Sequence, residues 1–471
     1  MPPPPHLLKI NLSWLPLVLL LLLNLFSLAL CVSVITHLPG FRGRLPFYLE
    51  TGYVSVDEEK GVELFYYFIT SERSPSEDPV LLWLTGGPGC SAFSGLVDEI
   101  GPLKFVKSPY NGSLPNLVYF PDSWTKVANI IFLDSPVGTG FSFSASPEGY
   151  YVGDLSSSMQ VHSFIIKWFI DHPQFLSNPF YVSGDSYAGK LVPLIAQIIS
   201  EGTNYGNDLV LNLKGYLIGN PATGEKIDQN SKVPYAHGVG IISDQIYELV
   251  QRHCEGEDYK HPCNVLCAKM LDTVEELISK VQKTNILEPK CPRASPKPKS
   301  KVERMYVGIR YRELLGPPEP PPSFKCRTYV HLLNYYWANS KSTQEALHVK
   351  KGTVREWQRC NDDLPYTKDL HSSIKHHLNL TSRGYRALVY SGDHDLVVPF
   401  LGTQEWVRSL NFPIVSDWRS WNFGGQSAGF TITYSNNMTF ATVKGAGHTA
   451  PEYRPKECLA MIRRWLSLKP L

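Results

Sequence analysis

Short apolar runs alternate with amphipathic segments along most of this chain. Each run is dense in Val, Ile, Leu, Phe or Tyr, as expected of strands buried on both faces of a sheet. Between the runs, helices are expected at residues 156–171, 187–200 and 455–468. The alternation predicts an α/β fold with a central, mainly parallel sheet and helices on both faces. The predicted strands are residues 80–84, 130–133, 180–183, 213–218, 387–390 and 440–443.

The alternation lapses between about residues 223 and 351, where helices are expected instead. Ser243 is a candidate N-cap before an apolar helical face, and residues 274–281 repeat apolar side chains at helical spacing. Five cysteines crowd into the same stretch, so we expect a helical, disulfide-stapled insertion over the sheet. These cysteines are Cys254, Cys263, Cys267, Cys291 and Cys326.

A Pro-rich, basic segment lies inside this insertion. Residues 289–322 hold nine prolines, and residues 290–312 hold eight basic side chains against one acidic. Such a composition packs poorly, which favours an exposed loop that proteases can cut to leave two chains. An ordered Pro-rich loop that is never processed is the alternative.

The first 33 residues differ from the rest of the chain. His6 and Lys9 precede an uncharged run at 15–35 that ends among small residues such as Ala29 and Ser33. This pattern predicts a signal peptide at 1–33, with a retained membrane anchor as the alternative. The mature domain at 34–471 would then enter the secretory pathway, for the vacuole or the cell exterior, without a stable membrane span.

Charge and cysteine content agree with that destination. The chain has 45 Lys and Arg residues against 43 Asp and Glu, a net charge of +2 that argues against nucleic-acid binding. Eight of the nine cysteines follow the leader, as suits an oxidising compartment, and none lies in a zinc-binding pattern. N-glycosylation is expected at the sequons of Asn111, Asn379 and Asn437.

Candidate chemistry begins at Ser186, in a tight turn between a predicted strand and a helix. Its neighbours Gly184 and Ala188 are small, as a nucleophile elbow requires, although the usual pattern has Gly at the second position. Two further side chains follow predicted strands: Asp395, close to Asp393, and the Gly-flanked His448. The chain order Ser, Asp, His is that of α/β-hydrolases. Ser186 alone would more often be structural, but the three together predict a catalytic triad.

A Gly-rich turn follows the predicted strand at 80–84. Acyl transfer needs N–H donors for the developing oxyanion, and such a turn supplies one of them. In this fold the second is the N–H of the residue after the nucleophile, here Tyr187. Phosphate binding is disfavoured because neither common phosphate-loop pattern is present.

These residues resemble the serine carboxypeptidase family. The resemblance rests on residues 83–91 (Trp-Leu-Thr-Gly-Gly-Pro-Gly-Cys-Ser), 184–189 (Gly-Asp-Ser-Tyr-Ala-Gly), 390–395 (Tyr-Ser-Gly-Asp-His-Asp) and 445–448 (Gly-Ala-Gly-His). It extends from Leu38 to the C-terminus. The chain is most similar to the plant serine carboxypeptidase-like proteins, many of which are acyltransferases.

The resemblance implies roles for further residues. It favours Asp395 over Asp393 as the catalytic acid and places the oxyanion donors on Gly87 and Tyr187. Disulfides would join Cys90 to Cys360, Cys254 to Cys267 and Cys291 to Cys326, leaving Cys263 and Cys458 over. The residues that recognise a substrate carboxylate would be Trp83, Thr85, Gly86, Glu99 and Asp185.

Two of these positions depart from the peptidase pattern. Thr85 stands where peptidases have Asn, and Asp185 stands where they have Glu. Both changes should weaken a clamp for a free carboxylate, because that clamp needs an amide and two carboxyl groups that share a proton.

The expected function is therefore serine-dependent acyl transfer in secondary metabolism. The acyl group, phenolic in many relatives, would move from a 1-O-β-glucose ester to a hydroxyl acceptor, with no metal or nucleotide cofactor. The alternative is a carboxypeptidase acting on peptide C-termini. A binding protein with a vestigial triad is less favoured, since no triad member is substituted.

Overall fold

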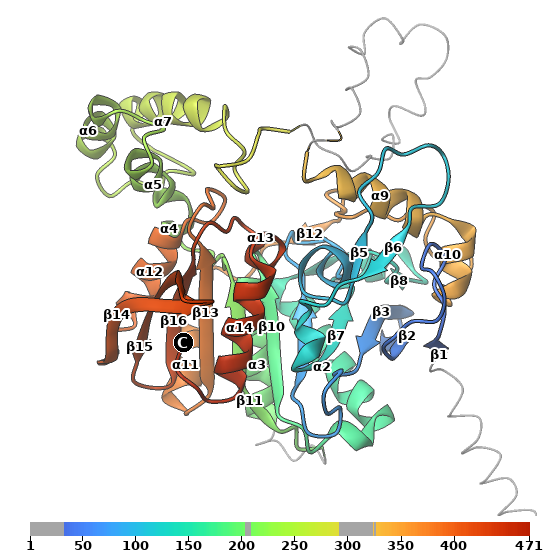
Figure 1. The fold of residues 1–471 in the computed structure, drawn as a ribbon. Helices are drawn as coiled ribbons and strands as arrows, with labels where there is room; N and C mark the ends of the chain where they lie inside the picture. Colours follow the sequence, from blue (N-terminus) through green and yellow to red (C-terminus); the bar gives the residue numbers. More distant parts are fainter. Residues whose placement is uncertain (1–32, 203–208, 292–323, 325) are drawn as a thin grey trace, which may run out of the picture.

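The computed structural model describes residues 33–202, 209–291, 324 and 326–471 (Figure 1). The predicted signal peptide lies outside these residues except for Ser33, which begins β1 (Ser33–Ile35). The Pro-rich segment lies outside them except for residues 289–291. Among the described residues, no helix combines the length and the apolar character that crossing a membrane requires.

The six predicted strands form the parallel centre of one large sheet, in the spatial order β7-β4-β10-β11-β13-β16. The predicted α/β architecture is confirmed, because each run is almost wholly buried between two helical layers. Their bounds are β4 (Val80–Leu84), β7 (Asn129–Leu133), β10 (Phe180–Asp185), β11 (Leu213–Gly219), β13 (Arg386–Gly392) and β16 (Met438–Val443).

Antiparallel strands extend this sheet on both sides, so the sheet as a whole is mixed rather than mainly parallel. β1, β2 (Leu49–Asp57) and β3 (Val62–Ile69) precede β7, with β8 (Phe143–Ser144) paired to β3. β15 (Gln426–Tyr434) and the edge strand β14 (Ile414–Phe423) follow β16. Two small sheets pair β5 (Leu103–Phe105) with β6 (Leu117–Tyr119) and β9 (Val152–Gly153) with β12 (Tyr366–Thr367).

Helices cover both faces of the sheet. Apolar side chains of α2 (Asp154–Asp171), α3 (Ala188–Gly202), α11 (Ile374–Ser382) and α12 (Phe400–Ser409) pack into one core. Those of α9 (Tyr329–Ala338) and α14 (Pro455–Leu466) pack into the core on the other face, and α13 (Ala450–Tyr453) precedes α14. Three of these helices were predicted from the sequence to within two residues at each end: α2, α3 and α14.

The predicted insertion divides between two cores. α4 (Ile227–Asn230), α5 (Lys232–Gly238), α6 (Asp244–His253) and α7 (Val265–Ile278) form a small unit above the carboxyl ends of the strands (Figure 1). α9 and α10 (Lys341–Ala346) instead lie beside the sheet. Trp337 of α9 and Leu347, directly after α10, pack into the same core as α14. Within the small unit Ser243 caps α6 as predicted, because its Oγ accepts the N–H of Ile246.

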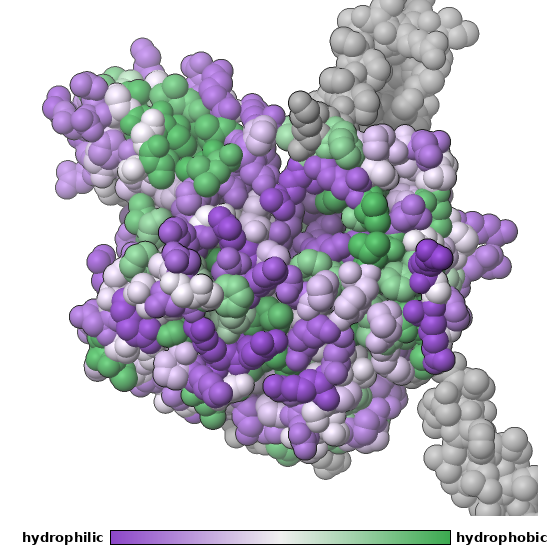
Figure 2. All heavy atoms as spheres, in the orientation of Figure 1, coloured by the Kyte–Doolittle hydropathy of each residue, from purple (hydrophilic) through white to green (hydrophobic). Residues whose placement is uncertain are grey.

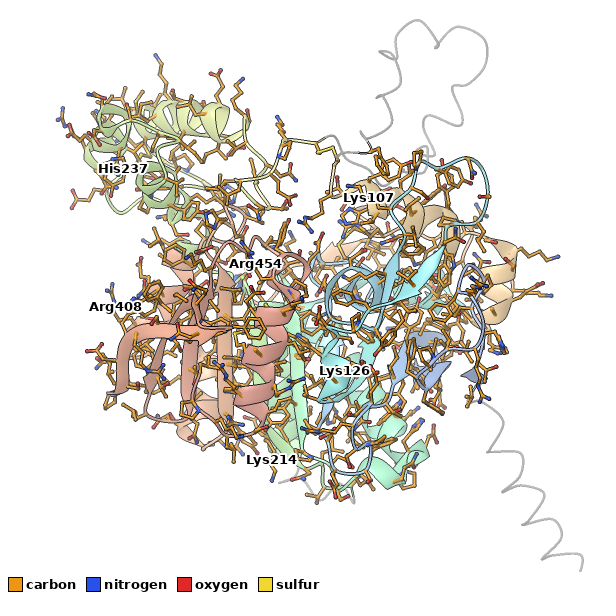
Figure 3. All side chains as sticks on the ribbon, in the orientation of Figure 1. Lys107, Lys126, Lys214, His237, Arg408 and Arg454 are labelled. Atoms are coloured by element: carbon orange, nitrogen blue, oxygen red, sulfur yellow. A yellow bond between two sulfur atoms is a disulfide. The ribbon has the colours of Figure 1, made fainter. Side chains whose placement is uncertain are left out.

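Side chains join the helices of this small unit. His237 on α5 lies 2.7 Å from the Asp244 carboxylate at the start of α6 (Figure 3). Cys254 and Cys267 form a disulfide between α6 and α7. Apolar side chains such as Val265 and Leu266 remain exposed, and Figure 2 shows hydrophobic residues gathered on this unit.

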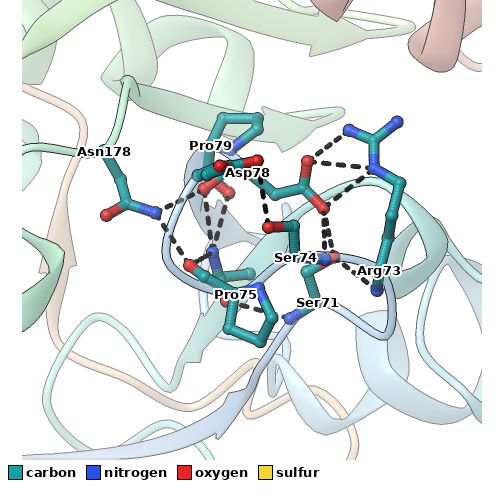
Figure 4. Close-up of polar contacts among 9 residues, drawn as sticks. Ser71, Arg73, Ser74, Pro75, Asp78, Pro79 and Asn178 are labelled. Carbon is teal, nitrogen blue, oxygen red and sulfur yellow. Dashed lines mark hydrogen bonds and ion pairs between the residues drawn. The ribbon is translucent and has the colours of Figure 1, made fainter.

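A polar network fixes the amino ends of three central strands (Figure 4). Asn129 at the start of β7 and Asn178 before β10 both donate from Nδ2 to the carbonyl oxygens of Pro75 and Asp78, just before β4. The buried Asp78 carboxylate accepts the hydroxyl of Ser71. These hydrogen bonds hold the amino ends of β7, β4 and β10 together.

Candidate active site

Ser186, His448 and Asp395 meet at the carboxyl edge of the sheet. Ser186 Oγ lies 2.8 Å from Nε2 of His448, and Nδ1 of His448 lies 2.8 Å from Oδ2 of Asp395. An ionised carboxylate only accepts hydrogen bonds, so Nδ1 carries the proton and Nε2 is left to accept from the serine. This is the geometry of a serine nucleophile with its general base.

The backbone explains the small neighbours of Ser186. Ser186 has φ 55°, a left-handed conformation, and its N–H donates to the carbonyl oxygen of Gly219 at 2.9 Å. A Cβ on Gly184 would lie 2.4 Å from the carbonyl oxygen of Leu84 and 2.9 Å from Cβ of Ala188. The strained turn therefore needs Gly at 184, whereas Ala fits at 188.

Asp395 is surrounded by donors. It is fully buried and accepts from the N–H groups of Val397 and Val398 and from Nδ2 of Asn220, besides His448. Asp393 instead accepts the N–H of Gly445 at 2.7 Å. Asp395 thus contacts the imidazole, while Asp393 braces the loop that carries it.

The charges around His448 favour its protonated form. Burial disfavours a charged imidazole, but the carboxylates of Asp395 and Asp185 outweigh burial and raise the pKa of His448. A proton taken up by this imidazole would therefore be stabilised.

The Gly-rich turn lies against the elbow. A Cβ on Gly86 would sit 2.6 Å from Cβ of Ser186 and 2.8 Å from the backbone nitrogen of Tyr187. Gly87 has φ 124°, which a side chain disfavours. Within the described part of the chain, no hydrogen bond uses the N–H of Gly87 or of Tyr187. Both donors are free to bind an oxyanion.

Two features that lie outside the turn hold it in place. The disulfide Cys90–Cys360 joins the turn to a segment from the second half of the chain. The buried Asp134, directly after β7, accepts from Ser91 Oγ at 2.6 Å and from the N–H of Ala92 at 2.9 Å. Sequence reasoning missed Asp134, because no local pattern marks it.

Comparison with known proteins agrees with this geometry. A family model for serine carboxypeptidases matches residues 39–468. The chain belongs to the serine carboxypeptidase family. Serine carboxypeptidase-like 17 of Arabidopsis thaliana is 47% identical over 461 residues, which cover 98% of each chain. Serine carboxypeptidase-like 12 of the same plant is 47% identical over 438 residues, covering 92% of this chain and 94% of the relative.

A solved structure shares the fold. A prohormone-processing carboxypeptidase of Saccharomyces cerevisiae superposes with a TM-score of 0.68 at 19% identity, covering 89% of this chain and 91% of that one. The likeness shows that this serine carboxypeptidase-like protein has the α/β-hydrolase fold, as its sequence predicts.

The residues implied in substrate recognition lie around the triad of this serine carboxypeptidase-like protein. In the described part of the chain, Nε1 of Trp83, Oγ1 of Thr85 and Oε2 of Glu99 are buried without a hydrogen-bond partner. Asp185 accepts the N–H of Gly86 at 3.2 Å. Of these three residues, Glu99 lines the cavity beside His448, so its carboxyl group is the one that the described structure places next to open space at the site.

The two buried carboxyl groups at this site hold protons more tightly than usual. Burial raises the pKa of Asp185 to about 6. Burial, followed by the charge of Asp185, raises the pKa of Glu99 well above its usual range. At mildly acidic pH the pair therefore carries at least one proton and offers a donor.

A cavity of about 220 Å³ opens beside His448. A second cavity of about 430 Å³ shares Asp98 and Glu452 with it and reaches Lys107, beside α9 (Figure 3). The sequence analysis missed the residues that line the first cavity on the side of α9 and α13. They include His331, Arg359 and Glu452.

The structure also describes the sequon asparagines and the remaining cysteines. Asn111, Asn379 and Asn437 are all exposed, as glycan attachment requires. The disulfide Cys291–Cys326 is formed, so the structure has all three bridges that the resemblance implied. Of the two cysteines left over, Cys263 is exposed and Cys458 is buried.

Proposed function

We propose that this protein is a serine-dependent acyltransferase that moves an acyl group from a 1-O-β-glucose ester to a hydroxyl acceptor through an acyl-enzyme. The observation that carries the proposal is the state of the carboxyl pair. Asp185 is hydrogen-bonded to the backbone of Gly86, and no hydrogen bond joins it to Glu99 in the described part of the chain.

A peptide C-terminus would need a different arrangement. Its carboxylate must be met by donors, and in the peptidase pattern these are an Asn amide and a carboxyl group that shares its proton with a second one. Thr85 offers one hydroxyl in place of an amide, and Asp185 is one methylene shorter than Glu. A neutral, polyhydroxyl group can instead both donate to and accept from Thr85 and Glu99.

Each residue of the site has its own role in the proposed acyl transfer. Ser186 Oγ attacks the ester carbonyl while Nε2 of His448 takes its proton, and the N–H groups of Gly87 and Tyr187 bind the oxyanion. The C–O bond to the sugar breaks, and His448 returns the proton to the leaving glucose oxygen. His448 then deprotonates the acceptor hydroxyl, which attacks the acyl carbonyl and releases Ser186.

A substrate panel tests the proposal. The purified enzyme is incubated with glucose esters of phenolic acids and hydroxyl acceptors, and in parallel with blocked dipeptides, and products are followed by mass. We expect transfer products and negligible amino-acid release, with both absent from Ser186→Ala as the control. Efficient dipeptide hydrolysis without transfer to any acceptor would instead establish a carboxypeptidase.

A double substitution tests the residues behind the choice. Thr85→Asn with Asp185→Glu should raise dipeptide hydrolysis relative to acyl transfer, because it restores the amide and lengthens the carboxyl group. Each unsatisfied buried polar group costs about 1–3 kcal/mol, so two repaired contacts amount to several orders of magnitude in turnover. Asp244→Glu, on the exposed start of α6, serves as a matched control.

We further propose that the protein acts in the secretory pathway, in the vacuole or outside the cell, as two chains. The disulfide Cys291–Cys326 flanks the Pro-rich segment and would hold the halves together after cleavage. Two bands under reducing conditions, from the native source, are expected. A single band of full mature size would contradict the processing.

A further inference from the structure

Asp154, the first residue of α2, carries a fully buried carboxylate outside the triad. Its Oδ1 accepts the hydroxyls of Tyr187 at 2.8 Å and Tyr366 at 2.9 Å. Its Oδ2 accepts Nζ of Lys190 at 3.1 Å and the N–H of Leu370 at 3.0 Å. Four donors from two separate segments, residues 187–190 and 366–370, therefore converge on one side chain.

Capping of its own helix does not account for this carboxylate. An aspartate in the first turn usually interacts with free N–H groups of the helix. Here the N–H of Leu155 donates to Oδ1 of Asp369 at 3.1 Å, and the N–H of Gly153 donates to Oγ of Ser156 at 2.8 Å. Every hydrogen bond to the Asp154 carboxylate within the described residues comes from elsewhere in the fold.

One of the four donors belongs to the reaction centre. Tyr187 follows the nucleophile, and its backbone N–H is one of the two proposed oxyanion donors. The carbonyl oxygen of Tyr187 accepts the N–H of Lys190 at 3.0 Å, while its hydroxyl is bound by Asp154. Lys190 Nζ, paired with Asp154, also lies 5.0 Å from the centre of the Tyr187 ring. The residue is thus held at both its backbone and the far end of its side chain.

We propose that Asp154 is a positioning residue for the oxyanion hole, holding Tyr187 so that its N–H points at the oxygen that becomes charged. This inference rests on the proposed acyl-enzyme mechanism. An oxyanion donor works only within about 2.7–3.1 Å of that oxygen, so a small rotation of the elbow removes its benefit. A carboxylate bonded to the phenol and to Lys190 opposes such a rotation.

Two phenols on the same carboxylate oxygen provide a matched test. Tyr187→Phe and Tyr366→Phe each delete one hydroxyl that donates to Asp154 Oδ1, but Tyr366 lies on β12 and carries no oxyanion donor. The assay is cleavage of an activated p-nitrophenyl ester, which requires only acylation and deacylation of Ser186. We expect Tyr187→Phe to lower kcat about tenfold or more, a part of the 10²–10³-fold value of a whole donor. KM should stay within about twofold, because the oxyanion exists only beyond the ground state.

Tyr366→Phe should keep kcat within about twofold of the unsubstituted enzyme, and both variants should have similar melting temperatures. Asp154→Asn should lower kcat by about the same factor as Tyr187→Phe. The double variant should have the same kcat as either single variant, because both substitutions remove the same contact. If Asp154→Asn fails to fold, the comparison of kcat between Tyr187→Phe and Tyr366→Phe still tests the positioning role.

The outcomes separate this inference from the proposed function. Equal kcat values for the two Tyr variants, with the unsubstituted enzyme cleaving the ester through Ser186, would overturn the positioning role alone. Absence of any Ser186-dependent cleavage in the unsubstituted enzyme would overturn the acyl-enzyme mechanism and this inference with it.

Discussion

Gly86→Ala should block acylation of Ser186 while leaving the protein folded. The added Cβ would lie 2.6 Å from Cβ of Ser186, 2.8 Å from the nitrogen of Tyr187 and 3.0 Å from the carbonyl oxygen of Asp185. None of these atoms is the free end of a flexible side chain. Nonbonded carbon atoms prefer about 3.5–4.0 Å, so the turn and the elbow must separate by roughly 1 Å.

That separation moves the donors out of hydrogen-bonding range of the oxyanion. Losing one donor costs about 10²–10³-fold in kcat, or about 2.7–4 kcal/mol. The crowding itself should destabilise the fold by about 1–3 kcal/mol, as overpacking of a filled site usually does. Catalysis is therefore expected to suffer far more than folding.

The measurement is kcat for p-nitrophenyl ester cleavage, together with the melting temperature of each variant. Gly238→Ala is the control, since nothing lies within 4 Å of a Cβ built on that residue at the end of α5. It should keep full activity. A Gly86→Ala enzyme that retains a third or more of its kcat at an unchanged melting temperature would refute the oxyanion assignment.

Three further outcomes are expected. Ser186→Ala should lower kcat on the order of 10³-fold or more without changing the melting temperature, and a purified variant that keeps most activity would contradict the triad. Peptide mapping without reduction should recover Cys90 linked to Cys360, and replacing both by Ala should cost about 2–5 kcal/mol in urea unfolding; free Cys90 would contradict the bridge. Burial raises the pKa of Asp98 to about 7, above its usual value of 3.8, so its folded form holds a proton that the unfolded form has lost. Asp98→Asn should therefore gain stability relative to the unsubstituted protein by roughly 2 kcal/mol between pH 5 and pH 7, and a constant difference in urea unfolding would exclude this.

The parallel centre of the sheet was predictable because burial on both faces leaves dense apolar runs in the sequence. The edge strand β14 was not predicted, for the opposite reason. β14 is mostly exposed, with Ser416, Asp417, Arg419 and Ser420 among its residues, so no apolar run marks it. Its structure comes from pairing with β15.

The close approach of Ser186, Asp395 and His448 could be predicted because each residue sits in a short local pattern that the fold demands. The small residues Gly184 and Ala188 are needed because the turn around Ser186 is crowded. This steric requirement involves only residues within a few positions of Ser186, so the local sequence shows it. Asp134 and Asp154 carry no such pattern. Their partners come from distant segments, and an isolated aspartate in a sequence has no mark that shows which donors will meet it.

The distinction between transferase and peptidase also depends on contacts between distant residues that no local motif marks. Both proposed reactions use Ser186, His448 and the two oxyanion donors. The motifs that identify the family therefore do not distinguish acyl transfer from peptide hydrolysis. What differs is whether the site neutralises a substrate carboxylate, and that depends on how Glu99 and Asp185 share protons and donors. Asp185 bonded to the Gly86 N–H leaves Glu99 without a hydrogen-bonded carboxyl partner. We infer that the shorter reach of Asp185 keeps its carboxylate on the Gly86 N–H and weakens the pair as a clamp for a substrate carboxylate, in line with the proposed function.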